Sequence, residues 1–192
     1  MDKSKESVNK KLEELEYFKY VDSNNLESIV EKTFEDYKED GIINFPWEGL
    51  NRIFGIDAES IYESNGIYDL IKVMLPIFKA MGIDLKVGGY VEEFDNNSST
   101  YTKRTIELNE KTYDTSGSSD RATAFNSGFK LVDEILKEFG KEERVFGLFM
   151  DESSTMIILD EPQFEYLNEL IPEGATYHPI DIKKMMIEHY GE

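Results

Sequence analysis

The sequence predicts an α+β protein, in which a helical N-terminal part is followed by a small antiparallel or mixed sheet packed against helices. Three observations support this fold class. Apolar residues recur at helical spacing through the first 81 residues, the period then changes to two, and helical and strand-like segments alternate from residue 121 onward. The 192 residues contain no repeat and no linker-like segment, so we expect a single domain over residues 1–192, with residues 1–40 as a possible helical extension.

The N-terminal part carries the apolar stripes that are typical of amphipathic helices. The predicted helices cover residues 5–20, about 23–41, a short stretch opened by Pro46 and stopped at Gly55, a second short stretch capped by Asp57, and about 66–81. Pro76 lies inside the last of these and should kink or split it. Trp47, the only tryptophan, has helical spacing to Leu50 and Phe54, which favours a place in the core over stacking on a ligand.

The middle of the chain is expected to form strands. The pattern predicts a strand start at 83–87, a loop or hairpin turn at 95–99, and a second strand at 100–108 that is polar enough for an edge or for one wet face. The Gly88-Gly89 step inside this pattern indicates a bulge or bend. Residues 112–120 are small and polar, and we expect a flexible loop there.

The C-terminal part alternates between helices and strands. It predicts an amphipathic helix at 121–139, a strand at 144–150, a hairpin turn at 151–154, a partner strand at 155–159, a helix at 162–171 and a terminal helix at 180–190.

The stretch TMIILDEP, residues 155–162, resembles the Walker B strand of an ABC-type ATPase. Such a site needs a P-loop, whose lysine and hydroxyl hold the nucleotide phosphates and Mg²⁺. The one Gly-Lys pair, Gly140-Lys141, is not followed by Ser or Thr, and it comes after a predicted helix rather than a strand. We therefore interpret Asp160 as an N-cap that forms a capping box with Gln163, and we exclude an ATPase.

The charge of the chain restricts its partners. Forty acidic residues against 21 basic residues give a formal net charge of −19. This excess repels a nucleic-acid backbone and an anionic membrane surface, and it attracts a basic protein partner. An acidic surface that only maintains solubility is the alternative explanation.

The chain is expected to be cytoplasmic. It has no cysteine, its first residues are charged rather than apolar, and its longest apolar candidate is interrupted by Asp69, Lys72 and Lys79. Nothing in the sequence indicates a cofactor, and the oligomeric state is left open.

Motifs for catalysis are weak. His178 and His189 are too far apart in sequence to be two ligands on one helix face, and no Ser or Cys has the surroundings of a nucleophile. The pairs Asp151-Glu152 and Asp160-Glu161 flank one strand, which would place them roughly 25 Å apart. A hydrolase-type enzyme with a carboxylate-based site, with or without a divalent metal, remains the alternative function.

Part of the C-terminal half resembles a group of mostly uncharacterised bacterial proteins that includes immunity-like proteins of polymorphic toxin systems. The resemblance covers about a quarter of the chain and is carried by FN (125–126), LVDEILKEFG (131–140), EERVFGLFM (142–150), TMIILDEP (155–162) and QFEYL (163–167). It implies an acidic α+β protein that binds a cognate toxin and blocks it.

We therefore expect an acidic intracellular protein-binding module without catalytic activity, of which a toxin-neutralising immunity-like protein is one form. Its contact surface would combine acids with aromatic anchors. The candidate contact residues are Tyr17, Tyr20, Asp114, Asp120, Asp151 and Glu152. A structural or oligomer-forming module is a further alternative.

Overall fold

The computed structural model confirms the α+β fold class. It describes residues 2–37, 42–56, 60–61, 63–148, 154–175, 177–182 and 184.

The described helices and strands follow one another along the chain in a mixed order. The helices are α1 (Lys5–Glu14), α2 (Leu26–Thr33), α4 (Gly66–Ala80), α5 (Arg121–Glu138) and α6 (Glu161–Leu170). The strands are β1 (Ile53–Ile56), β2 (Val87–Asp95), β3 (Thr100–Leu108), β4 (Lys111–Asp114), β5 (Gly117–Ser118), β6 (Arg144–Leu148), β7 (Ser154–Leu159) and β8 (Pro179–Ile180). None of these helices is long and apolar enough to cross a membrane.

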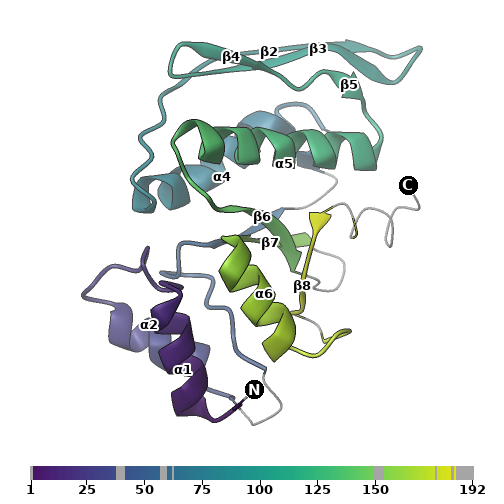
Figure 1. Cartoon of the computed structure of the whole chain (residues 1–192). Helices are drawn as coiled ribbons and strands as arrows, with labels where there is room; N and C mark the ends of the chain where they lie inside the picture. Colours follow the sequence, from purple (N-terminus) through teal and green to yellow (C-terminus); the bar gives the residue numbers. More distant parts are fainter. Residues whose placement is uncertain are drawn as a thin grey trace.

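The elements form four layers (Figure 1). At the top of the view is a sheet of β2, β3, β4 and β5, here called the upper sheet, and α4 and α5 lie beneath it. Below these helices is a sheet with strand order β1-β7-β6-β8, here called the central sheet. Helices α1, α2 and α6 form the bottom layer. The N-terminal helices therefore lie against the rest of the chain rather than apart from it.

The central sheet is antiparallel and is covered on both faces. Met156 and Ile158 of β7 belong to the apolar cluster around α4 and α5, whereas Ile157 and Leu159 belong to the cluster around α1 and α6. A strand buried on both sides needs apolar residues without alternation. This explains the uninterrupted stretch that resembles a Walker B strand.

The region after β7 has the predicted capping box. The Asp160 carboxylate accepts from the Gln163 N–H at 2.9 Å, and the Gln163 side chain accepts from the Asp160 N–H at 3.2 Å. Asp160 and Glu161 therefore begin α6, where the helix dipole favours negative charge.

Among the described residues, the upper sheet is covered by helices on one face. Ile106, Leu108 and Tyr113 point into the cluster that contains α4 and α5. β3 pairs antiparallel with β2 on one side and with β4 and β5 on the other, so β2 is an edge strand. The register between β2 and β3 shifts between Val87 and Tyr90, which confirms the bulge expected at Gly88-Gly89.

Several N-terminal expectations were wrong. The first helix ends at Glu14 rather than residue 20, and the second begins after Asn25 rather than Ser23. The segment expected to end a short helix is strand β1, because pairing with β7 overrides a weak helical pattern. Trp47 is 49 % exposed rather than in the core, and its ring covers Gly55.

In the middle of the chain the loop expected at 112–120 is wrong, and so is the split at Pro76, which was one of two alternatives for that helix. Residues 112–120 are not a loop, because β4 and β5 occupy most of the segment and pair with β3. Pro76 does not divide α4, which is assigned as one helix from Gly66 to Ala80. Most of the predicted helix at 180–190 lies outside the described residues.

Candidate functional site

The two tyrosines predicted as contact residues have internal roles. Tyr17 is completely buried, where its ring packs edge-on against Phe18, so it is unavailable to a partner. Burial raises its pKa above the ordinary tyrosine range. Tyr20 is half-buried, and its hydroxyl donates to the Glu143 carboxylate.

These tyrosines surround a buried arginine. Arg52 donates to the carbonyl oxygens of Tyr17 at 2.7 Å, Ile158 at 2.9 Å and Glu16 at 3.3 Å. It thereby ties the segment after α1 to the central sheet. Burial would raise the pKa of Glu143, but hydrogen bonds from Lys19 and Tyr20 outweigh burial and lower this pKa to about 2.

Of the predicted acidic contact residues, Asp114 and Asp120 lie within the described part of the chain, and both bond to neighbouring main-chain groups. Asp114 accepts from the Ser116 N–H at 2.9 Å, and Asp120 is the N-cap of α5, accepting from the Thr123 N–H at 2.8 Å. Tyr20 contacts Glu143, which follows the other end of this helix, and the helix is about 27 Å long. Asp151 and Glu152 lie outside the described residues.

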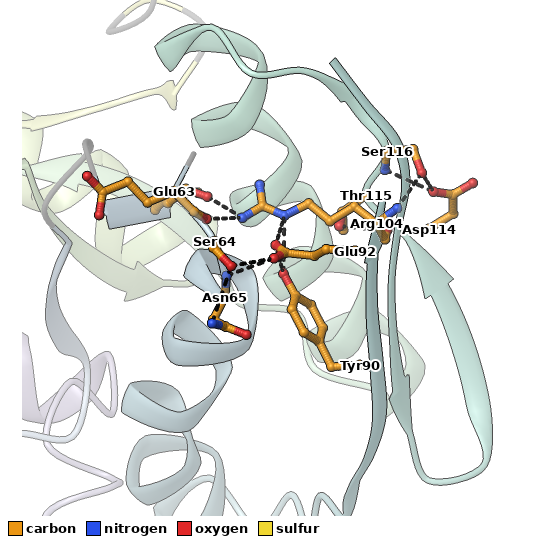
Figure 2. A network of polar contacts seen from close by, with 10 residues as sticks. Glu63, Ser64, Asn65, Tyr90, Glu92, Arg104, Asp114, Thr115 and Ser116 are labelled. Carbon is orange, nitrogen blue, oxygen red and sulfur yellow. Dashed lines mark hydrogen bonds and ion pairs between the residues drawn. The ribbon is translucent and has the colours of Figure 1, made fainter. Parts of the chain in front are cut away.

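The most extensive polar cluster lies where the upper sheet meets the start of α4 (Figure 2). Its centre is Arg104 of β3, which is buried. The Arg104 Nε donates to Glu92 Oε1 at 3.0 Å and to the Tyr90 hydroxyl at 3.2 Å. Its Nη2 donates to the carbonyl oxygens of Ile61 at 2.6 Å and Glu63 at 2.9 Å.

Glu92 completes the cluster from β2. Besides Arg104, its carboxylate accepts from the Tyr90 hydroxyl, from Ser64 Oγ at 3.1 Å and from the Asn65 N–H at 3.0 Å. Burial would raise the pKa of Glu92, but these hydrogen bonds and the Arg104 charge lower it. A carboxylate with this many donors is a poor base, so the cluster acts as a clamp that holds β2 over α4.

Other titratable groups in the described residues do not assemble into a reaction centre. Burial raises the pKa of Asp133 to about 6, although the Val145 N–H donates to it at 2.8 Å. The Nδ1 of His178 lies 3.0 Å from the Ile171 carbonyl oxygen. Within the described ranges, no group of three His, Cys, Asp or Glu residues is placed to hold a metal ion.

The clamp supports a strand that exposes apolar side chains. Val91 and Phe94 of β2 are 41 % and 45 % exposed, and the strand also carries Glu92, Glu93 and Asp95. This combination of apolar and acidic residues on an edge strand is the candidate functional site. Sequence reasoning missed it, although the acids and apolar residues of 87–95 were visible, because only the sheet order shows that the strand lies at an edge.

Comparisons with protein-family models, with curated proteins and with solved structures find no match for the chain.

Proposed function

We propose that this chain is an acidic, cytoplasmic protein-binding module without catalytic activity, and that its partner is a basic protein. The observation that carries the proposal is the candidate site on β2, where exposed Val91 and Phe94 stand beside the acids Glu93 and Asp95 on an open strand. Apolar side chains with a charged surround are typical of binding surfaces.

The distribution of charge supports the same proposal. Arg52 and Arg104 are buried and bonded internally, so these two positive charges do not offset the acids of the surface. A surface with this excess of negative charge accelerates encounters with a positively charged protein. We further propose that the partner is a toxin that this chain neutralises, as the resemblance to immunity-like proteins implies.

Affinity capture tests the proposal. The immobilised chain is exposed to a nuclease-treated lysate of the source organism and eluted with a salt gradient. We expect one basic protein in stoichiometric amount, released at moderate salt because screening weakens the attraction. Capture of nothing across the gradient contradicts the proposal.

Two further experiments test whether the capture depends on β2 and whether the captured protein is a toxin. Phe94→Lys should reduce retention, whereas Val73→Lys, which makes the same change of charge at an exposed position of α4, should not. For the finer proposal, the captured protein is expressed alone and together with this chain. Toxicity that the chain relieves supports neutralisation, and a harmless partner contradicts it.

The alternative, a carboxylate-based hydrolase, has one observation in its favour: the buried Asp133 with a pKa raised to about 6. Titration with millimolar Ca²⁺ or Mg²⁺, read by thermal melting, tests its metal-dependent form, since a bound ion stabilises the folded state. An unchanged Tm counts against it.

A further inference from the structure

We propose that the free edge of β2 receives an extended basic segment of the partner as an additional strand. This inference rests on the proposed function and specifies its binding mode.

The direction of the main chain in β3 shows which groups of β2 are free. The Thr115 N–H donates to the Arg104 carbonyl oxygen at 2.8 Å, and the Arg104 N–H donates to Ser116 Oγ at 2.8 Å, so the main chain of Arg104 points away from β2. Arg104 lies opposite Glu92 in the register. In an antiparallel ladder such a pair is not hydrogen-bonded, so the N–H and C=O of Glu92 also point away from β3.

Tyr90 has the same orientation, because it is two residues before Glu92 and the register between them is regular. Two N–H and two C=O groups therefore face outward along this edge. Among the described residues, no main-chain bond to these groups is found beyond the β2–β3 ladder. They are the groups that an added strand pairs with.

The composition of β2 identifies the occupant. Edge strands are often protected by lysine or proline, but VGGYVEEFD has neither, and two of its acids, Glu93 and Asp95, lie outside the Arg104 clamp. A second copy of the chain would bring acids toward acids, on top of a net charge of −19 on each molecule. A segment with lysine or arginine is complementary in charge.

Half-buried apolar residues lie beside this edge. Tyr68 of α4 and Tyr90 of β2 pack against the core while remaining partly exposed, and their rings are 5.5 Å apart. An added strand would direct every second side chain toward this side of the sheet. Apolar side chains of the added strand at those positions would cover the Tyr68 and Tyr90 rings further.

A pocket of about 390 Å³ opens at the start of β2. It is lined by Asp84, Glu107 and Glu110, with Lys86 as the only base. Gly88 leaves room for the Glu107 side chain, because a Cβ at Gly88 would lie 2.6 Å from the Glu107 Oε1. These three carboxylates place negative charge beside the start of the free edge, which favours a lysine or arginine side chain of the added segment there.

The test uses the full chain and two synthetic peptides. One is a nine-residue peptide of alternating lysine and valine with blocked ends. The other has the same residues with N-methylated valines, so its charge is unchanged but half of its main-chain donors are removed. We expect the first to slow hydrogen exchange at the Tyr90 and Glu92 amides. The second should bind about tenfold more weakly, as the loss of one or two net hydrogen bonds implies.

Variants locate the site. Val91→Lys adds a positive charge on β2 without altering the outward main-chain groups. We expect it to weaken binding of the first peptide about fivefold. Val73→Lys is the control, because Val73 is 54 % exposed on α4, and it should leave the affinity unchanged. Glu107→Gln should weaken binding through the pocket, with a thermal melt to confirm folding.

The outcomes separate the two proposals. Equal affinity of the two peptides, or protection of amides elsewhere, overturns strand addition and leaves the proposed function intact. If neither peptide binds in a salt-sensitive way, strand addition is overturned. If affinity capture also retains nothing, the proposed function fails as well.

Discussion

The two sheets differ in how they are covered. The central sheet is buried on both faces, whereas the upper sheet has helices on one face and an open edge at β2 (Figure 1). Each is held by one buried arginine. Arg52 joins the segment after α1 to β7 of the central sheet. Arg104 joins β3 to Glu92 of β2 and to the segment just before α4. The difference sets a scaffold with two buried faces in the centre against a more open surface above it.

The largest effect is expected from the core of the central sheet. Ile157→Ala empties space between β7 and the bottom helices and should cost about 4 kcal/mol of unfolding free energy. Val91→Ala on the open face of β2 should cost less than about 0.5 kcal/mol. Chemical denaturation of both variants measures the contrast, and equal losses would contradict the division into scaffold and open surface.

The Arg104 clamp comes next. Arg104→Met leaves Glu92 buried without its cation and should cost about 3 kcal/mol. Hydrogen exchange should accelerate in β2 and β3 but not in β7. Arg144→Met is the matched control, because Arg144 forms an exposed pair with Glu161 and should cost about 0.5 kcal/mol. If hydrogen exchange accelerated equally in both sheets, the effect of the clamp would not be confined to the upper sheet.

A smaller effect is expected from pH. The folded-state pKa of Asp133, about 6, lies above its ordinary value of 3.8, so the folded state binds this proton more tightly. The contribution of Asp133 to stability therefore falls as pH rises from about 4 to about 6. Arg144, which lowers this pKa, and Asp181, which raises it, are the charged groups that act on Asp133.

Asp133→Asn removes this titration and keeps an oxygen for the Val145 N–H. Between pH 7 and pH 5 the wild type should gain about 1 kcal/mol relative to the variant, or roughly 3 °C in Tm. Parallel melting profiles of the two proteins over this range would contradict the burial of a charged Asp133.

The smallest effect concerns Trp47. A Cβ at Gly55 would lie 2.9 Å from the Trp47 ring, but the half-exposed ring can move outward, so Gly55→Ala should cost about 1 kcal/mol. Tryptophan fluorescence should shift to the red as the ring enters water. Gly89→Ala in β2 meets no atom within 4 Å, and it should change neither stability nor fluorescence.

Much of the fold could be predicted from local pattern. The segments 100–108 and 121–138 and the capping box at Asp160 match the sequence closely, because alternation, amphipathic spacing and capping residues act within one element. Strand β1 and the strands inside 112–120 could not be predicted in this way. The partner of β1 is β7, about 100 residues later in the chain, and the small polar residues of 112–120 do not show the apolar alternation of a strand, although β4 follows its partner β3 directly.

The candidate site depends still more on distant residues. Arg104 joins Glu92 on the neighbouring strand to carbonyl oxygens more than 40 positions earlier in the chain, and nothing in the local sequence marks that meeting. Tyr17 shows the opposite error. It was predicted as a contact residue on the surface, but it is buried, and its ring packs near the buried guanidinium of Arg52.

The central claim is that a basic partner binds through the open edge of β2. The most direct measurement is hydrogen exchange of the Tyr90 and Glu92 amides in the full chain, with and without the partner captured from the lysate. We expect both amides to become protected on binding, and Val91→Lys to reduce that protection. Unchanged exchange at both amides, with protection elsewhere on the chain, would contradict the claim.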